Sequence, residues 1–464
     1  MSRLIIVSNR VSAVKARSED TSQGGLAVAL TAALRESDGI WFGWSGESTE
    51  RFDGKISMAS AGGVTTATVD LEEQDVDEYY NGYANRTLWP LFHYRIDLAE
   101  FDRQFGEGYE RVNEGFAETL SGLIGERDKI WVHDYHLIPL AQQLRQRDIG
   151  NPIGFFLHTP WPPHRLLTAL PFHKRLVESL LEYDLIGFQT REWQESFLHY
   201  LGREIENCTV EGGTIRFNGR VIESDVFPIG IDKDEFVSLT GKPGAMAAHD
   251  TVISTMRGRA CIIGVDRLDY SKGLIERFRG YRRFLEEHPE YRRQVEFLQI
   301  APPSRGEVHT YASIREELDQ LSGRINGQFS EVDWSPIRYV NQGYQRAELA
   351  GLYRAADVAL VTPLRDGMNL VAKEYVAAQD EEDPGVLILS KFAGAAEQMT
   401  DALLVNPYSK DDLSDRLHQA LSMDLDERKA RWRSLMGVVR QGDVHDWWRA
   451  FVSRLEECRQ PALC

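Results

Sequence analysis

The sequence contains no apolar run that approaches the roughly 18 residues needed to cross a bilayer as a helix. Its first apolar stretch, Leu4–Val7, is short and is followed too soon by Arg10 to be a secretory signal. Cysteine is scarce as well: the four residues lie far apart and include no C-x-x-C pair. That spacing argues against a disulfide framework or a zinc site. We therefore expect a cytoplasmic protein without a membrane partner.

Basic residues are also fewer than acidic residues. Lysine and arginine total 53 against 71 acidic residues, which gives a formal net charge of −18. Nucleic acids and anionic membranes require a basic face, so neither is an expected partner. There is no G-x-G-x-x-G and no G-x-x-x-x-G-K-[ST], which disfavours nicotinamide and flavin enzymes and P-loop NTPases. If the substrates are anions, a few cations must act on them locally.

What the sequence does have is a regular alternation of short apolar runs and helix-length amphipathic segments. At 464 residues it exceeds the size at which one core keeps growing, so two domains are expected. Continuous Val/Ile/Leu/Phe runs are typical of parallel strands buried on both faces. The first series of predicted strands is Leu4–Ser8, Lys129–His133, Ile153–His158, Leu185–Gln189 and Asp225–Ile229. The second is Cys261–Val265, Val295–Ile300, Ile337–Val340, Val358–Thr362, Val386–Ser390 and Leu403–Val405.

Two series of this kind predict an α/β protein with two Rossmann-like, doubly wound domains. Gly and Pro interrupt both patterns in Leu239–Gly244, so we place the domains at 1–238 and 239–445. The amphipathic, aromatic segment at about 446–464 is expected to be a helix that packs on one of them.

The run Leu364–Glu374 is the most informative stretch. It links the predicted strand Val358–Thr362 to a predicted helix through a Gly-containing turn. Free backbone N–H groups at such a junction, together with the helix dipole, favour a phosphate. Glu374 lies one turn into that helix, where its carboxylate could accept a ribose hydroxyl. The run therefore predicts a nucleotide site.

Several cations lie at predicted strand ends. Arg10 ends the first strand, and Gly24–Gly25 opens the helix that follows it. Arg267 and Lys272 follow the first strand of the second domain, and Arg305 follows the next. Ligands of open α/β sheets bind at these ends, and a guanidinium and an ammonium can share one pyrophosphate. Solvated loop charges are the alternative, but in an acidic protein a binding site is the better interpretation.

Histidines and acidic pairs suggest a metal only weakly. His133–His136 has the spacing for two ligands, but no matching cluster appears elsewhere, so we interpret Asp134 as an acceptor for a sugar hydroxyl. His158 ends an apolar strand, and a structural or a functional role is equally open. Asp75–Asp77 has the letters of an Asp-x-Asp metal motif but lies in an acidic helix-like run, as a solvated face would.

Motifs in order along nearly the whole chain resemble those of the trehalose-6-phosphate synthases. They are Ser8–Arg10, Gly24–Leu26, Trp41–Gly46, Glu78–Asn81, Leu88–Pro90, His133–His136, Arg267–Gly273 and Arg365–Glu374. The resemblance implies a GT-B fold, with two Rossmann-like domains facing a cleft and a C-terminal helix that crosses back to the first. It also implies retaining transfer of glucose from UDP-glucose to glucose 6-phosphate, giving α,α-trehalose 6-phosphate and UDP, without a metal or other cofactor.

The resemblance further implies roles for individual residues. The acceptor would be held by Arg10, Tyr80, Trp89, Asp134 and Arg305. The donor would be held by Gly24, Gly25, Arg267, Lys272, Asp366, Gly367, Met368, Asn369, Leu370, Val371 and Glu374. The catalytic set would be Arg267, Lys272, Asp366, His158 and Asp134.

Two other functions stay open at this point. One is a glucosylglycerol-phosphate synthase that uses ADP-glucose and glycerol 3-phosphate, since the same cations would hold either acceptor. The other is a catalytically silent sugar-phosphate sensor, which would not need the donor residues found here. The sequence leaves open the donor base, and whether the chain forms a homo-oligomer.

Overall fold

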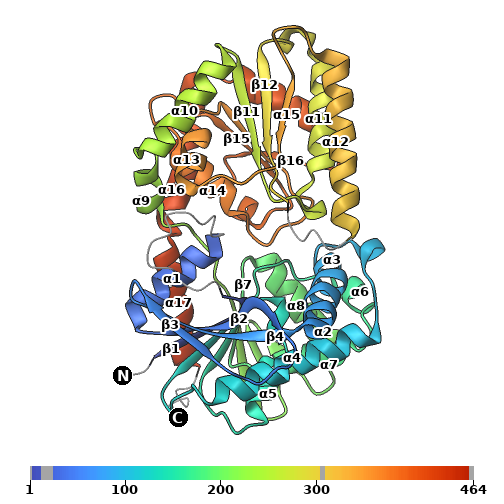
Figure 1. Cartoon of the computed structure of the whole chain (residues 1–464), viewed down its shortest axis with the longest axis vertical. Coiled ribbons are helices and arrows are strands. Elements are labelled where there is room, and N and C mark those ends of the chain that lie inside the picture. The colour runs from blue at the N-terminus through green and yellow to red at the C-terminus, as the bar shows by residue number, and fades with distance from the viewer. Residues whose placement is uncertain (1–2, 12–24, 304–308, 459–464) are drawn as a thin grey trace. The chain divides into compact units, whose positions relative to one another are not determined.

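A computed structural model describes residues 3–11, 25–303 and 309–458, which form two compact units (Figure 1). Unit 1 contains the first strand, Leu26–Pro228 and the segment from His445 onward, and unit 2 contains Ile229–Val444. The division between Pro228 and Ile229 lies upstream of the predicted boundary at 238/239. No helix in the described part of the chain is long and apolar enough to cross a membrane.

Unit 1 is built on a ten-stranded sheet of order β3-β4-β2-β1-β5-β6-β7-β10-β9-β8. Its strands are β1 (Leu4–Arg10), β2 (Ile40–Thr49), β3 (Ser57–Ala61), β4 (Val64–Glu72), β5 (Lys129–His133), β6 (Ile153–Phe156), β7 (Leu185–Phe188), β8 (Thr209–Glu211), β9 (Thr214–Phe217) and β10 (Arg220–Val226). From β4 to β10 all neighbours are parallel, whereas β3 and the β8–β9–β10 ribbon add antiparallel pairs at the edges.

Unit 1 helices cover both faces of this sheet. They are α1 (Gly25–Ser37), α2 (Glu73–Asp75), η1 (Val76–Leu88), α3 (Trp89–Phe92), η2 (Ile96–Leu98), α4 (Arg103–Ser121), η3 (Tyr135–Leu137), α5 (Leu140–Arg145), α6 (His164–Leu167), α7 (His173–Leu180), α8 (Arg191–Glu204) and α17 (Val444–Glu457). The segment Glu72–Tyr80, predicted as helix-like, is α2 followed by η1, which is a π-helix.

Unit 2 has a fully parallel six-stranded sheet of order β13-β12-β11-β14-β15-β16. Its strands are β11 (Ala260–Val265), β12 (Val295–Ile300), β13 (Ile337–Val340), β14 (Val358–Val361), β15 (Val386–Ser390) and β16 (Leu403–Val405). Its helices are α9 (Lys233–Leu239), α10 (Pro243–Met256), η4 (Tyr270–Lys272), α11 (Leu274–Glu287), η5 (Pro289–Tyr291), α12 (His309–Phe329), α13 (Arg346–Arg354), α14 (Leu370–Ala378), η6 (Gly394–Glu397), α15 (Lys410–Ser422) and α16 (Leu425–Gln441).

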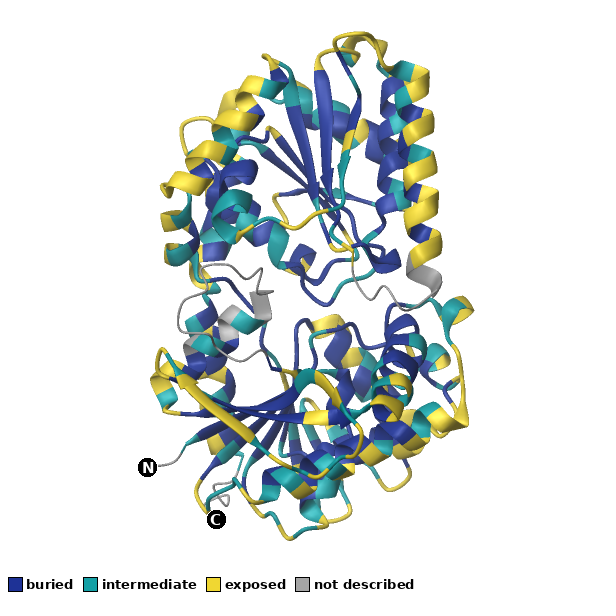
Figure 2. Ribbon diagram, viewed as in Figure 1, coloured by how far each residue is buried: buried dark blue, intermediate teal, exposed yellow. Residues whose placement is uncertain are grey.

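The central strands are the buried core of each unit, as the dark blue strands of Figure 2 show, and this confirms the predicted two-sheet α/β class. Strands β2 and β4 were not predicted, because Gly, Ser and Thr interrupt their apolar pattern. A strand was predicted at Asp225–Ile229, whereas β10 ends at Val226. The reason is that β10 alternates buried and exposed residues and is not a continuous apolar run.

Helix α17 packs on the sheet of unit 1. Its Phe451 ring stacks on Trp131 of β5 with centroids 4.6 Å apart, and Trp447 lies 4.9 Å from the same indole. A Cβ at Gly154 of β6 would lie 2.6 Å from the Phe451 ring, so a glycine is needed for this approach. The aromatic face of α17 therefore completes the core of unit 1.

In both sheets the chain starts in the middle, builds outward on one side, and then returns to build the other. The reversal lies between β1 and β5 in unit 1 and between β11 and β14 in unit 2. The carboxyl ends of strands at such a switch point form the usual ligand site of an open α/β sheet. Arg10 and Asp134 follow the first pair of strands, and Arg267 and Asp366 follow the second.

Candidate functional site

In unit 1 the switch point presents an exposed cation beside an aromatic ring. The Arg10 guanidinium ends β1 and lies 5.6 Å from the Trp44 ring centroid. Gly46, at φ +94°, leaves room for it, because a Cβ there would lie 2.4 Å from Arg10 Nε. Arg10 is thus held over an indole while remaining open to solvent, which suits an anion.

Aromatic residues form a wall next to this cation. Tyr80 meets Trp44 edge to face at 5.5 Å and stacks on His136 at 6.2 Å. Trp89 is buried and contacts the Tyr135 ring at 5.7 Å. Both Tyr80 and Trp89 are set by the π-helix η1, which places Tyr80 within it and Trp89 directly after it. Since π-helices are rare and often occur at functional sites, this segment is well suited to shape a binding surface.

Asp134 follows β5 with a positive φ of 74°. Its Oδ1 accepts the backbone N–H of His158 at 3.2 Å, and its own N–H donates to the Phe156 carbonyl. The strand ends of β5 and β6 are therefore tied together. This arrangement fixes the predicted acceptor residue Asp134 next to His158.

His158 belongs to a chain of neutral side chains. Its Nδ1 lies 3.2 Å from the Gln189 amide nitrogen and its Nε2 lies 3.0 Å from His133 Nδ1. Burial lowers the pKa of His158 to about 3 and holds the pKa of His133 well below its ordinary value. With the Gln189 amide donating to Nδ1, the remaining proton lies on Nε2 and is donated to His133. Both ring nitrogens of His158 are therefore already engaged, one by Gln189 and one by His133.

In unit 2 the switch point is organised by an ion pair. Lys272 Nζ lies 2.6 Å from Asp366 Oδ2, and the Asn369 amide donates to the same oxygen at 3.0 Å. The backbone of this loop is fixed on the far side, because the Asp366 N–H donates to Phe392 and the Ala395 N–H donates to Met368. Arg267 is exposed and forms no ion pair within the described residues. The loop thus holds the Lys272 ammonium in place, whereas the Arg267 guanidinium is exposed to solvent.

Beneath these residues lies a buried arginine that was not predicted. Arg277 of α11 is fully buried and its guanidinium pairs with Asp266 at 2.8 Å. It also donates to Thr362 Oγ1 at 2.8 Å and to Gln299 Oε1 at 2.9 Å, so it joins the ends of β11, β12 and β14. Burial raises the pKa of Asp266 against the opposing effect of Arg277. A charged residue on the apolar face of α11 was the signal that could have revealed it.

Helix α14 carries the last predicted donor residues. Leu370 and Val371 are partly exposed in its first turn, and Asn369, at φ 87°, caps it with its side chain. Burial raises the pKa of Glu374 to about 7, with Arg346 opposing the shift. Lys373 is buried and donates to the Ile229 carbonyl and to Gln398, and burial lowers its pKa to about 7.

Not all of the predicted site residues lie in the described part of the chain. Gly24 and Arg305 lie outside the described residues. Gly25 is the first residue of α1, and its surroundings are not described. The remaining predicted residues gather at the two switch points, one set in each unit.

A family-level comparison matches residues 2–457 to glycosyltransferase family 20. The trehalose-6-phosphate synthase of Enterobacter sp. (strain 638) is 46% identical over 458 residues, covering 98% of this chain and 95% of that protein. The chain belongs to glycosyltransferase family 20. The resemblance found in the motifs and the glycosyltransferase class of enzyme are thus confirmed.

Solved structures of this glycosyltransferase family have the same fold. The α,α-trehalose-phosphate synthase (UDP-forming) of Burkholderia vietnamiensis has a TM-score of 0.96 and 46% identity, covering 100% of this chain and 99% of that one. The corresponding enzyme of Burkholderia xenovorans, in complex with glucose-6-phosphate, has a TM-score of 0.93 and 49% identity, covering 98% and 100%. The GT-B prediction is therefore confirmed.

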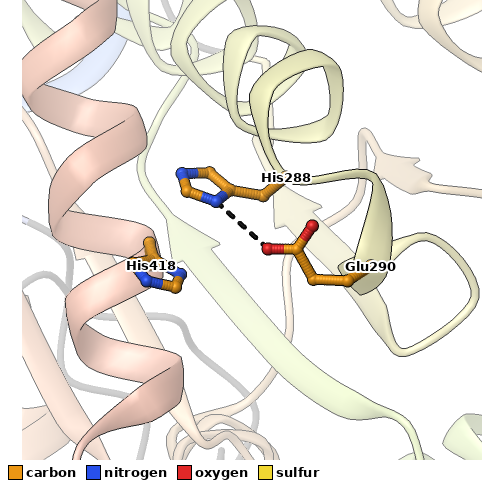
Figure 3. Close-up of side chains that lie close together, drawn as sticks. All are labelled: His288, Glu290 and His418. Atoms are coloured by element: carbon orange, nitrogen blue, oxygen red, sulfur yellow. Dashed lines mark hydrogen bonds and ion pairs between the residues drawn. The ribbon is translucent and has the colours of Figure 1, made fainter.

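Within the described residues of this family 20 chain, one group could hold a metal ion: His288, Glu290 and His418 in unit 2 (Figure 3). His288 Nδ1 lies 3.3 Å from Glu290 Oε1, and the two imidazoles stack with centroids 4.3 Å and planes 5° apart. The lone pair of an imidazole nitrogen lies in the plane of its ring. The lone pairs of two parallel rings therefore do not point at one metal ion, as the ligands of a metal must. The group shares no residue with the predicted site.

Asp75, expected on a solvated face, is instead buried and paired with Arg111 at 2.5 Å.

Proposed function

We propose that this chain transfers glucose from UDP-glucose to glucose 6-phosphate with retention of configuration, releasing UDP and α,α-trehalose 6-phosphate. The observation that carries the proposal is the unit 2 switch point, where Lys272 is held by Asp366 and Arg267 is exposed, without an ion pair to any described residue. A sensor would not need this donor machinery. The names of the related proteins support this activity over the glucosylglycerol-phosphate synthase and the silent sensor.

On the donor side, Arg267 and Lys272 bind the diphosphate and stabilise it as it leaves. Asp366, Gly367 and Met368 hold the transferred glucose, and Glu374 accepts a ribose hydroxyl. Further donor contacts come from Gly24, Gly25, Asn369, Leu370 and Val371. Because two cations offset the diphosphate charge, the proposed reaction needs no metal or other cofactor.

On the acceptor side, Arg10 and Arg305 bind the phosphate of glucose 6-phosphate, and Tyr80, Trp89 and Asp134 bind its sugar. Asp134 has an oriented carboxylate and Tyr80 a partly exposed ring, which supports these roles. His158 lies beside the transferred glucose as a neutral group, so it does not act as an acid. Its low pKa supports that assignment.

The chemical step breaks the bond between C1 of glucose and the diphosphate oxygen and forms a bond from C1 to the acceptor hydroxyl on the same face. The hydroxyl proton passes to the departing phosphate oxygen. No protein nucleophile is required. Positioning of the substrates and charge stabilisation by Arg267 and Lys272 then account for the rate.

One product experiment tests the proposal. The protein is incubated with UDP-, ADP- or GDP-glucose against glucose 6-phosphate or glycerol 3-phosphate, and the products are identified by mass. We expect trehalose 6-phosphate with UDP-glucose. Glucosylglycerol phosphate as the main product, or no product from any pair, would reject it. Activity should persist in excess chelator, and a loss restored by magnesium would reject the metal-free reaction.

We also propose that the protein is cytoplasmic. It is supported by Cys208, Cys261 and Cys458, which are free thiols, as expected in a reducing compartment.

A further inference from the structure

Unit 1 contains a pocket that the proposed function does not use. It has a volume of about 320 Å³ and lies where α6 packs against α8, both labelled in Figure 1. It is lined by Pro163, His164, Arg165, Ser196, His199 and Arg203. None of these is a predicted donor or acceptor residue. Among the described residues that line it, none is acidic.

Two arginines give this pocket its charge. Arg165 and Arg203 are both exposed, and neither forms an ion pair with any described residue. Most other arginines of this acidic chain do pair with carboxylates, for example Arg145 with Asp184 at 2.9 Å. Two uncompensated guanidinium groups at one pocket, in a protein of net charge −18, are a local concentration of positive charge.

The geometry of α8 places its polar residues on one side. Ser196, His199 and Arg203 are spaced by three and four residues, so they share a helix face. Arg203 Nε donates to His199 Nε2 at 3.0 Å, which leaves the terminal nitrogens of this guanidinium for a ligand and puts the imidazole proton on Nδ1. The hydroxyl of Ser196 adds a further donor on the same face.

One carboxylate, that of Glu204, is bound by His164 of the pocket lining. Glu204 Oε1 lies 2.7 Å from His164 Nε2, and its other oxygen lies 3.7 Å from Lys174. The hydrogen bond from His164 is the main reason that the pKa of Glu204 is lowered. The His164 side chain is only 10% exposed, so it forms a fixed wall. Glu204 is thus held by His164 and Lys174, and among the described residues it forms no ion pair with Arg165 or Arg203.

We propose that this pocket binds the phosphate group of a small metabolite, or free phosphate, at a site separate from the glucosyl-transfer residues. Guanidinium groups match a phosphate as paired N–H donors, and Ser196 and His199, which also line the pocket, carry further polar groups. The pocket opens directly after the segment Thr159–Pro163, which joins His158 to α6. An occupant would thus bind next to the chain segment that carries His158.

Histidine NMR gives a local readout, because the chain has only 12 histidines. The full-length protein, labelled at histidine, is titrated with inorganic phosphate, with glucose 1-phosphate, and with sodium chloride at matched ionic strength. The His199 signal is assigned with His199→Gln. We expect a saturable shift of His199 with phosphate, with the phosphate ester, or with both, and no saturable shift with chloride. The two phosphate arms distinguish a free from an esterified ligand.

Variants distinguish specific phosphate binding at this pocket from a general effect of positive charge. Arg165→Gln/Arg203→Gln should weaken the phosphate-dependent shift of His199 by about tenfold or more, the effect of losing charge-assisted hydrogen bonds. The control Arg216→Gln removes an exposed arginine of β9 in the same unit and should leave the titration unchanged. Absence of a saturable shift in the wild type, an equal shift with chloride, or an unchanged titration in the double variant would overturn the proposal. None of these outcomes depends on the glucosyl-transfer activity.

Discussion

The two units use one topology for two different kinds of recognition. In each, the sheet reverses direction in the middle and puts its functional residues after the two central strands. In unit 1 these residues are an exposed arginine, aromatic rings and neutral histidines. In unit 2 they are a lysine tied into an ion pair and an exposed arginine, with a second, buried arginine below.

The difference follows from what each site has to bind. A sugar offers apolar faces and hydroxyl groups, which aromatic rings and neutral acceptors recognise. A diphosphate that gains charge as it leaves is best stabilised by cations that are already positioned. The fold supplies the location, and the side chains at that location supply the chemistry.

The largest expected effect comes from removing the buried charge of unit 2. Arg277→Met leaves Asp266 buried without its partner, and we expect a loss of about 3–5 kcal/mol in the free energy of unfolding. The measurement is the shift of the urea transition. The matched control in unit 1 is Arg145→Met, which should cost less because Arg220 still contacts Asp184 at 3.2 Å. Equal losses in the two variants would contradict the distinction between the units, and Asp266→Asn should partly rescue Arg277→Met.

The next effect concerns the rate of the reaction. Lys272→Ala and Arg267→Ala should each lower kcat by about 10²-fold or more, because each removes stabilisation of the departing diphosphate. Arg279→Ala is the control, since this exposed residue of α11 pairs with Glu317 away from the switch point. Near-normal kcat in both Lys272→Ala and Arg267→Ala would exclude the proposed role.

A smaller effect is expected at the aromatic wall of unit 1. Tyr80→Ala should raise KM for glucose 6-phosphate about tenfold, since aromatic contacts contribute about 0.5–1.5 kcal/mol beyond burial. Tyr80→Phe keeps the ring contacts with Trp44 and His136 and should stay within a few-fold of the wild type. A rise in KM for UDP-glucose instead would place Tyr80 on the donor side.

Much of this arrangement could be predicted from sequence because buried parallel strands have an unmistakable apolar pattern. That pattern located β11 to β16 and the turn after β14, and with them Lys272, Asp366 and Glu374. It could not locate β2 and β4, where Gly, Ser and Thr dilute the apolar run. Arg277 stood out only as a charged residue on the apolar face of α11, and its partners, like those within the His133–His158–Gln189 chain, are distant from one another in sequence. Pairing of that kind is decided by tertiary packing.

The smallest expected effect is a pH dependence that distinguishes Glu374 of unit 2 from its neighbour Lys373. Burial raises the pKa of Glu374 from 4.5 to about 7, so its carboxyl group is protonated below that pH. A neutral acid accepts a ribose hydroxyl less well, and KM for UDP-glucose should rise by about fivefold as pH falls through 7. Saturating acceptor is needed, because its phosphate titrates near pH 6.

Glu374→Gln should show a high, pH-independent KM for UDP-glucose. The same shift has a consequence for stability: the folded state holds the Glu374 proton more tightly, so the free energy of unfolding falls as pH rises from 4.5 to about 7. Glu374→Gln should flatten that slope too.

Burial lowers the pKa of Lys373 to about 7 as well. A lowered lysine pKa makes the free energy of unfolding rise with pH above 7, which is the opposite sign. An inflection in KM that survives in Glu374→Gln and disappears in Lys373→Met would therefore assign the titration to the lysine and remove Glu374 from ribose binding.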